Sequence, residues 1–466
     1  MRKKNLFLGV AFVVALAFLV TACAPAATPA PAPTPEPGVT PPPPTPTPPP
    51  EEKVKLVFWW WGEEEAPGLE KWVDETAELF EQEHPNIEME TVQQTTDGLV
   101  PAAQAAAAAQ TGPDLQFYWP VAWLLEDIWN GNLAPLDDYI PEETEHYVSA
   151  FRQYATWEGK TYAAPFYLIG NPWVYNKELF AKAGLDPDNP PQTWDEFMEA
   201  GEKLNAAGII PIAAGMKDMW YADWPWMLLT PCTLDSNAEW FNTFLGLDGT
   251  KLSDPKYVQG WEKWQELIEK GFYSEEVMSL ELYEGFDLFL EEKAAIASPV
   301  QPLQVVWANE MGADKLGVFL TPCWADGKLG KKFPTASQYI AITAWSPHKK
   351  EAAEFIKFTH TPDRLAALYK HAGSFCADDR FDVNLITTDI DKKMYEWNMH
   401  NPTISVYYSA PPIIDEWIWP YAGKLFTGET TPEESCRVGE ETVAAWREAN
   451  PDSVENFKEW MKAFSD

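Results

Sequence analysis

Aromatic residues, joined by a few acidic ones, occupy the positions in this sequence where a ligand is expected to bind. The chain contains 24 tryptophans, 24 phenylalanines and 17 tyrosines. Aromatic rings can stack on the C–H faces of sugar rings, and neighbouring carboxylates and amides can hydrogen-bond to hydroxyl groups. Core packing is the alternative role for each ring. The candidate binding residues of this kind are Trp60, Trp61, Glu63, Asp114, Trp119, Trp220, Tyr221 and Trp224.

Catalytic motifs have much weaker support. The six histidines lie far apart and show no metal-binding spacing, and the chain has no G-x-S-x-G, Walker A or G-x-G-x-x-G sequence. Two carboxylates could in principle form a glycosidase pair, but 71 acidic residues do not single out any two. We therefore expect binding without a reaction, and no cofactor or metal.

The net charge of the chain argues against certain classes of ligand and binding partner. The formal net charge is −37, and removal of the three cations Arg2, Lys3 and Lys4 with a signal segment would make it −40. A field of this sign repels phosphate backbones and anionic lipids. Nucleic acids and anionic ligands are therefore disfavoured.

The elements that must position the aromatic residues alternate between strands and helices. The apolar run 53–59 predicts a buried strand, and apolar residues at helical spacing predict a helix that ends before Pro85. A strand near 87–91, a helix over 99–110 and a strand over 114–119 follow. This βαβαβ order predicts right-handed crossovers and an open, mostly parallel sheet.

The same alternation continues along the chain. Thr193 and Glu196 form a capping box that opens a helix, and Gly271 is placed to end another. Further strands are predicted over 209–213, 294–297, 316–320 and 339–343. Because the 413 residues from Val54 exceed what one core usually supports, two α/β lobes are expected. Ligands of such sheets bind beyond the carboxyl ends of the strands, where the candidate aromatic residues lie.

The N-terminus predicts export and attachment to a membrane. A positive cluster is followed by an apolar run and by the sequence Val20-Thr21-Ala22-Cys23, which resembles the lipobox of bacterial lipoproteins. Residues 1–22 are then a signal peptide, and Cys23 carries the lipid; a plain secretory signal is the alternative. Residues 23–53 form a tether, because 14 of the 27 residues from Ala24 to Pro50 are proline, which favours an extended chain of roughly 80 Å.

Four cysteines follow Cys23, and they suggest disulfides in an exported protein. They are Cys232, Cys323, Cys376 and Cys436, and they allow three connectivities. We favour Cys232 with Cys323 and Cys376 with Cys436. Free buried thiols are the alternative.

Several long segments resemble the extracellular solute-binding proteins of bacterial sugar ABC importers, of the maltose-binding-protein-like type. The most specific run combines WEGKTYAAPF at 157–166, VYNKELFAKAGL at 174–185 and TWDEF at 193–197. Weaker matches lie at 112–114, 289–296, 339–358 and 427–434. The resemblance covers nearly all of the chain from Val54 onward.

This resemblance implies a two-lobed periplasmic-binding-protein fold whose ligand cleft lies between the lobes. Crossings between the lobes are expected near 165–170, 333–338 and 373–378. The first lobe would comprise 54–165 and 336–374, and the second 166–335 and 375–466. The lobes would close on the ligand about a hinge.

The resemblance also implies binding residues near these crossings. They are Tyr167 after the first crossing, Gln301 in the loop after the strand 294–297, Ser337 and Gln338 at the second crossing, and Phe375 at the third. Gln304 belongs to the same loop region as Gln301. Relatives commonly have a Gly-Pro-Trp-like element where this chain has Ser298-Pro299-Val300, so the stacking partner there is open.

The function implied is that of a monomeric lipoprotein that captures a neutral sugar or oligosaccharide outside the cytoplasm. It would deliver this ligand to the permease subunits of an importer, with the lipid on Cys23 as its only membrane attachment. A non-sugar solute such as a polyamine is an alternative that the acidity of the chain would suit. A surface-tethered glycoside hydrolase is a further alternative.

Overall fold

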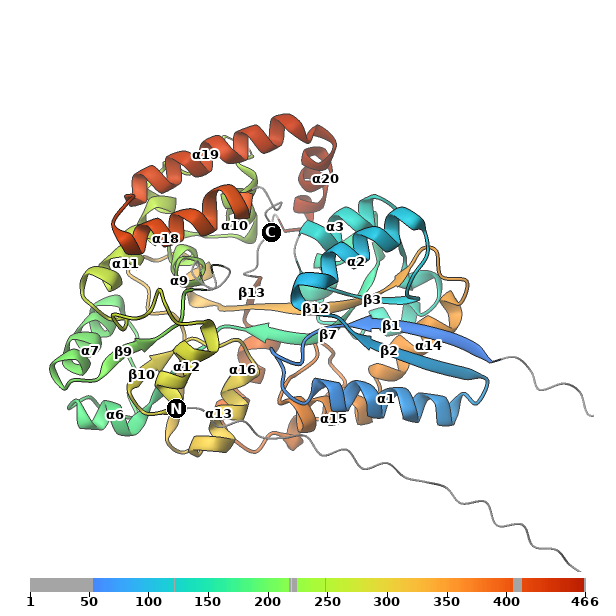
Figure 1. Ribbon diagram of the computed structural model, residues 1–466, viewed down its shortest axis with the longest axis horizontal. Helices are drawn as coiled ribbons and strands as arrows, with labels where there is room; N and C mark the ends of the chain where they lie inside the picture. Colours follow the sequence, from blue (N-terminus) through green and yellow to red (C-terminus); the bar gives the residue numbers. More distant parts are fainter. Residues whose placement is uncertain are drawn as a thin grey trace, which may run out of the picture. The chain divides into compact units, whose positions relative to one another are not determined.

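A computed structural model describes residues 53–120, 122–217, 219, 224–247, 249–404 and 413–464. The predicted signal peptide, Cys23, the tether up to residue 52, Trp220 and Tyr221 therefore lie outside the described residues. Within the described part, strands and helices build two main sheets, and each sheet with its covering helices forms one lobe (Figure 1).

The sheet of the first lobe contains seven of the described strands. They are β1 (Val54–Trp60), β2 (Ile87–Gln93), β3 (Leu115–Tyr118), β4 (Leu133–Ala134), β7 (Ala163–Gly170), β12 (Phe333–Thr343) and β13 (Pro402–Ile404). The order is β13-β12-β3-β1-β2, and β4 and β7 also pair with β12. β1 lies parallel to β2 and β3, as predicted, whereas β12 is antiparallel to β3, β4 and β7.

Helices cover both faces of this first sheet (Figure 1). One face carries α1 (Leu69–Glu83), α14 (Lys349–Thr359) and α15 (Pro362–Ala372), and the other carries α2 (Thr96–Ala109) and α3 (Ala122–Trp129). The stripe of α1 that faces inward includes Leu69, Trp72, Val73 and Phe80, all of them buried. The helix ends at Glu83, before Pro85, as predicted.

The sheet of the second lobe has four described strands in the order β11-β8-β10-β9. They are β8 (Trp173–Asn176), β9 (Ile210–Ala213), β10 (Ala294–Ala297) and β11 (Leu316–Phe319). Only β9 and β10 are parallel; β8 is antiparallel to both of its neighbours. The sheets are therefore mixed rather than mostly parallel. β8 enters this sheet from the crossing strand β7, and both of its neighbours, β10 and β11, run in the opposite direction.

The remaining helices lie mainly around the second sheet. They are α4 (Pro141–Thr144), α5 (Ser149–Tyr154), α6 (Lys177–Lys182), α7 (Trp194–Ala206), α9 (Trp224–Leu229), α10 (Asn237–Leu245), α11 (Pro255–Glu269), α12 (Leu282–Leu290), α13 (Leu303–Met311), α16 (Asp389–His400), α18 (Trp419–Thr427), α19 (Pro432–Ala449) and α20 (Pro451–Met461). Of these, α4 and α5 precede β7 in the first lobe. The capping box predicted at Thr193 and Glu196 opens α7.

The last of these helices, α20, contacts parts of both lobes. Trp460 donates its indole N–H to the backbone oxygen of Tyr154, 3.1 Å away. Its ring also lies 5.0 Å from the ring of Phe241 on α10. Phe457 packs edge-on against Trp129 of α3, at 4.7 Å between ring centroids.

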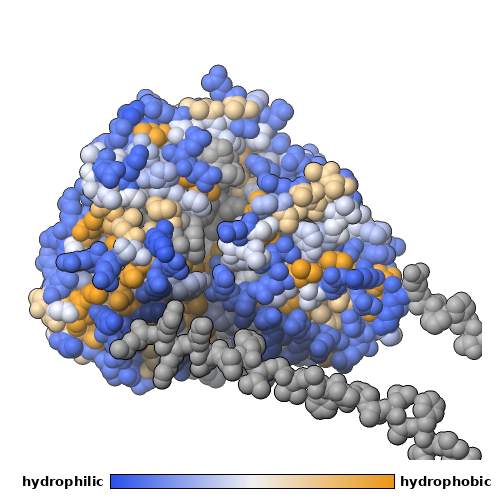
Figure 2. All heavy atoms as spheres, in the orientation of Figure 1, coloured by the Kyte–Doolittle hydropathy of each residue, from blue (hydrophilic) through white to orange (hydrophobic). Residues whose placement is uncertain are grey.

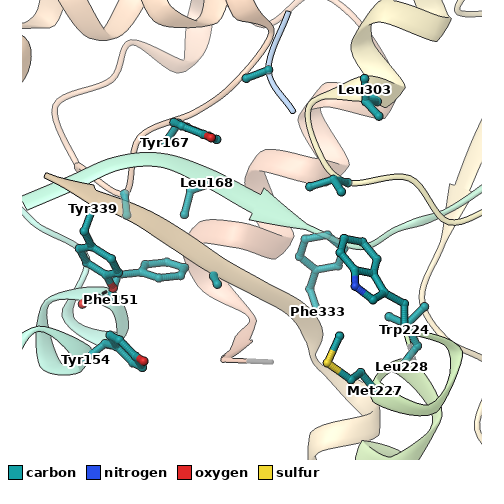
Figure 3. Close-up of a cluster of buried hydrophobic side chains, with 14 of the residues drawn as sticks. Phe151, Tyr154, Tyr167, Leu168, Trp224, Met227, Leu228, Leu303, Phe333 and Tyr339 are labelled. Carbon is teal, nitrogen blue, oxygen red and sulfur yellow. Dashed lines mark hydrogen bonds between the residues drawn. The ribbon is translucent and has the colours of Figure 1, made fainter. Parts of the chain in front are cut away.

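Two long buried strands, β7 and β12, run through the middle of the molecule and join the lobes. They pair antiparallel from Thr335 opposite Gly170 to Ala341 opposite Ala163, with a register shift between Ser337 and Tyr339. Figure 3 shows one aromatic cluster near the first-lobe end of this pair, with Tyr339 and Tyr154, and a second near the other end, with Trp224 and Phe333. The backbone N–H of Leu168 also donates to the Phe375 oxygen at 2.7 Å, which brings the third segment alongside β7.

One of the two favoured disulfides is present. Cys232 is bonded to Cys323, which ties the 3₁₀ turn Thr230–Thr233 to the loop after β11. Cys376 and Cys436 are free thiols, so the second favoured pairing is wrong. Both are buried in separate surroundings: Cys376 contacts the Pro165 oxygen at 3.3 Å beside β7, whereas Cys436 lies inside α19.

Loss of the Cys232–Cys323 bond is expected to destabilise the protein strongly. The bond closes a loop with a sequence separation of 91 residues, and removal of a native disulfide commonly costs about 2–5 kcal/mol. We expect Cys323→Ala to lower the free energy of unfolding by an amount in this range, measured by guanidinium denaturation. Cys436→Ala, which removes a buried free thiol, is the control. Equal effects of the two substitutions would show that the bond adds nothing.

Candidate functional site

The loop that joins β1 to α1 places three consecutive glutamates in three different environments. Glu63 accepts hydrogen bonds from the backbone N–H groups of Gly68 at 2.8 Å and Glu70 at 2.6 Å, and it therefore fixes the start of α1. The backbone oxygen of Glu64 accepts from the hydroxyl of Tyr283 on α12, at 2.9 Å. The third residue, Glu65, turns its side chain inward.

Glu65 contacts both strands that join the lobes. Its Oε2 accepts from the hydroxyl of Tyr167 on β7 and from Nε2 of Gln338 on β12, each at 2.7 Å. A Cβ atom built on Gly62, which has a φ of 130°, would lie 2.2 Å from the Tyr167 hydroxyl. Only glycine leaves room there for Tyr167 to reach the carboxylate.

The surroundings of Glu65 favour its protonated form. Crowding by protein atoms raises the pKa of Glu65 from 4.5 to about 7, although the hydrogen bonds from Gln338 and Tyr167 partly oppose this shift. Burial, together with the neighbouring Glu65 carboxylate, also raises the pKa of Tyr167, which therefore stays a hydrogen-bond donor. The group is poised to exchange a proton near neutral pH.

Three buried glutamines close to the crossing strands keep unused hydrogen-bonding atoms. Gln301 and Gln304 are fully buried, and Gln338 is 1% exposed. Among the described residues, no partner is found for Nε2 of Gln301, for either amide atom of Gln304 or for Oε1 of Gln338. Gln301 is held in place, because its backbone N–H donates to the Gly170 oxygen and its Oε1 accepts from Asn398, both at 2.7 Å. Buried polar atoms normally have partners, so these atoms keep hydrogen-bonding capacity for a polar molecule or for water.

Partly exposed tryptophans lie at the carboxyl edge of the first sheet, as predicted. The rings of Trp61 and Trp119 meet edge to face at 5.3 Å, and Trp123 lies 6.1 Å from Trp119. The indole N–H of Trp61 donates to the Thr96 hydroxyl at 2.9 Å, which fixes the ring. These rings form an aromatic shelf with part of its surface open.

The second lobe has a hollow of about 510 Å³ on its surface. It is lined by Met219, Met278, Asp415, Trp419, Pro420, Gly423, Lys424, Thr427 and Glu429. Met219 directly precedes the predicted residues Trp220 and Tyr221, which lie outside the described residues. The hollow combines an indole ring with charged groups, and the lack of a side chain at Gly423 leaves room within it.

The other predicted site residues lie inside the fold. Trp60 is 2% exposed in the core of the first lobe. Asp114 accepts from the backbone N–H of Val57 at 2.9 Å and from the Ser346 hydroxyl at 2.6 Å. Phe375 stacks on Tyr369 at 5.2 Å, and Ser337 donates to the Gln338 backbone oxygen at 2.7 Å.

Trp224 is also largely enclosed, in the second lobe. It is 9% exposed and lies at the start of α9. Figure 3 shows its ring beside Phe333 of β12. This position supports the end of the crossing strand.

Glu65 and Tyr283 are absent from the residues predicted to bind. A run of three glutamates after a strand is typical of a solvated loop, and no pattern in the sequence distinguishes the inward-facing member. Tyr283 lies on a helix whose carboxyl-terminal part resembles the family, but nothing in its spacing marks contact with a loop 219 positions earlier.

A thiol, an imidazole and a carboxylate also meet at the third crossing segment. Cys376 Sγ lies 3.8 Å from His360 Nδ1, and the same nitrogen lies 2.9 Å from Asp378 Oδ2. Activation of a nucleophile needs one ring nitrogen for the thiol and the other for the carboxylate. Although burial opposes it, hydrogen bonds from Arg380 and His360 hold the pKa of Asp378 well below its usual range. The group is a buried structural network, and burial raises the pKa of the Cys376 thiol.

The surface and the remaining polar clusters add few further sites. Figure 2 shows hydrophilic residues over most of one face of the folded body, in keeping with the acidic composition. Within the described ranges, no group of three or more His, Cys, Asp or Glu side chains could hold a metal ion. Nor does any described helix have the length and apolar character needed to cross a membrane.

The raised pKa of Glu65 predicts a specific pH dependence of stability. Because the folded-state pKa of about 7 exceeds the ordinary 4.5, stabilisation linked to this proton is complete below about pH 4.5 and is lost as pH rises through 7. Glu65→Gln keeps an acceptor oxygen for Tyr167 and Gln338 but removes the charge. We expect the variant to gain stability relative to the wild type above about pH 7.

The measurement is urea denaturation from about pH 5 to about pH 8. Glu83→Gln, an exposed change at the end of α1, is the control and should follow the wild type throughout. Parallel pH profiles for the wild type and Glu65→Gln would contradict a raised pKa at this position.

Solved structures resemble this chain over most of its length. A chain from work on xylan utilization by the thermophilic bacterium Caldanaerobius polysaccharolyticus is 20% identical, with a TM-score of 0.71, and the alignment covers 83% of this chain and 99% of the other. A chitin oligosaccharide binding protein is 21% identical, with a TM-score of 0.72 and coverage of 84% and 99%. At these identities the likeness establishes the two-lobed solute-binding fold.

Sequence comparison gives the family. A protein of Brucella abortus (strain 2308) that is named as a putative binding protein is 26% identical over 308 residues, which are 64% of this chain and 71% of the relative. Residues 59–363 match the sequence profile described as bacterial extracellular solute-binding protein. With its two-lobed fold, its joining strands and this match over more than half of its length, the chain belongs to the family of bacterial extracellular solute-binding proteins.

Proposed function

We propose that this protein captures a neutral sugar or oligosaccharide outside the cytoplasm and delivers it to the permease of an ABC importer. Members of its family bind solutes and are not enzymes, which sets the glycoside hydrolase aside. The ligand would lie between the aromatic shelf of Trp61 and Trp119, the Glu65 carboxylate and the buried glutamines. Trp60, Asp114, Trp224, Ser337 and Phe375 are buried or already bonded, so we assign them to support of the site rather than to ligand contact.

The observation that carries this proposal is the unused hydrogen-bonding capacity of the buried glutamines. The atoms without partners in the described structure include amide nitrogens, which donate, and amide oxygens, which accept. A sugar hydroxyl both donates and accepts, so a neutral saccharide can satisfy both kinds of atom. A polyamine cation supplies only donors, and it would leave the amide nitrogens of Gln301 and Gln304 unsatisfied. The presence of both donors and acceptors without partners therefore favours a neutral ligand with several hydroxyl groups.

The aromatic groups favour more than one sugar ring. The shelf belongs to the first lobe, and the hollow that contains Trp419 belongs to the second. The indole nitrogen of Trp419 is buried and lacks a partner among the described residues, so it too can donate to a hydroxyl. Chitin oligosaccharide is the ligand named for one of the structural relatives.

The lobes and the anchor complete the proposal. We assign 54–165 and 336–374 to the first lobe and 166–335 and 375–466 to the second, with closure about the crossing strands. After signal cleavage, a lipid on Cys23 would hold the protein at the membrane while residues 23–53 act as the tether. The protein would work as a monomer beside its permease.

A neutral oligosaccharide should bind, and Gln304→Leu should weaken it. The purified chain is titrated with a panel of xylo-, malto- and chito-oligosaccharides, and with spermidine, while tryptophan emission is recorded. Because leucine has nearly the shape of glutamine but cannot hydrogen-bond, we expect the variant to bind about tenfold or more weakly. Gln82→Leu, on the exposed face of α1, is the control. Binding of spermidine with silence toward every glycan would refute the sugar assignment.

Cys23→Ala should release the protein from the membrane. The substitution removes the atom that would carry the lipid, while the folded body has no described helix that could anchor it. We expect the wild type in the membrane fraction and the variant in the soluble extracytoplasmic fraction, detected by immunoblotting. A wild type that is recovered only in the soluble fraction would contradict lipidation.

A further inference from the structure

Tyr283 makes a contact between the two lobes that packing alone does not explain. It lies in the first turn of α12, which packs on β9 and β10 of the second lobe. Its hydroxyl donates to the backbone oxygen of Glu64, in the loop after β1 of the first lobe, at 2.9 Å. The side chain is 42% exposed, one of three exposed large hydrophobic residues in the described part of the chain. The ring is therefore held at the surface with its hydroxyl directed at the other lobe.

The helix that carries Tyr283 is fixed firmly to the second lobe. A Cβ atom built on Gly285 would lie 2.0 Å from the backbone nitrogen of Gly215, and one built on Gly215 would lie 1.9 Å from the Glu281 oxygen. The two backbones therefore touch, and both contacts require glycine. Glu281 also pairs with Lys217 at 2.7 Å. As a result, α12 moves together with the loop that follows β9.

The contacts of the Glu64 loop are equally well fixed on the first-lobe side. Glu63 binds the start of α1, and Glu65 binds the two crossing strands. The Glu64 oxygen is therefore held by the first lobe and the crossing strands. The hydrogen bond from Tyr283 joins it to the second lobe, at the residue next to Glu65.

We propose that Tyr283 is a positioning residue for solute binding, whose hydroxyl holds the lobes closed over the site through the Glu64 backbone. Because α12 is seated against residues 215–217, loss of this hydrogen bond would let the second lobe move away from the Glu64 loop. This inference depends on the two-lobed fold and not on the identity of the solute.

The test measures the distance between the lobes without any ligand. Spin labels are attached to cysteines introduced at Gln82 on α1 and Glu199 on α7, both exposed, while the buried thiols Cys376 and Cys436 are kept. Pulsed electron paramagnetic resonance then gives the populations of closed and open forms. Tyr283→Phe removes the hydroxyl and with it the hydrogen bond to Glu64. Because a hydrogen bond of ordinary strength is lost, we expect the ratio of closed to open molecules to fall about three- to tenfold.

Two further variants separate closure from general stability. Tyr283→Ala should open the lobes at least as much as Tyr283→Phe, with melting temperatures of both close to the wild type. Tyr139→Phe is the control, since no hydroxyl hydrogen bond of Tyr139 is found among the described residues, and it should leave the distances unchanged. The proposal would be overturned if the distance distributions of both Tyr283 variants matched that of the wild type. It would also be overturned if Tyr283→Ala opened the lobes and Tyr283→Phe did not.

Discussion

The antiparallel pairing of β7 with β12 is the interaction on which the rest of the structure depends. These strands begin in one lobe and end in the other, and nearly every residue in them is buried. Their paired hydrogen bonds extend from the first sheet to the second lobe. There β8 follows β7 after two residues. The same strands supply Tyr167 and Gln338 to the proposed site. A solute bound there would contact the segments that join the lobes, so that binding and lobe movement would share one set of atoms.

The loop of residues 62–68 links this arrangement to the proposed binding site. Its three glutamates connect it to a helix, to the opposite lobe and to the crossing strands. Because each connection uses a different residue, the loop is held at three points, and one of them lies in the opposite lobe. Most acidic side chains of this chain lie on a solvated surface, but in this loop, as at Asp114 and Asp378, they have a structural and electrostatic role.

The sequence predicts the helices and strands well, because the spacing of apolar residues and the capping residues of helices are patterns that span only a few positions. The capping box at Thr193 and the strands β1, β9 and β10 lie close to where they are expected. The site is harder to predict. Glu65 turns inward toward two hydrogen-bond donors that lie 102 and 273 positions away in the sequence, so no local pattern marks it. The prediction of a Cys376–Cys436 pair was wrong because these two cysteines lie in separate surroundings. The mixed sheets arise from antiparallel pairings between strands that are far apart in the sequence, such as β12 with β3 and β8 with β10.

The backbone contact between Gly215 and Gly285 also bears on how relatives of this protein diverge. A side chain at either position would collide with main-chain atoms, which cannot rotate away as a side chain can. The pair is therefore expected to be kept or lost together during evolution. Relatives that retain both glycines should share the same seating of α12 and close in the same way, even when their solutes differ. A relative with larger residues at both positions would have to seat α12 differently, and its lobes would then meet through other contacts.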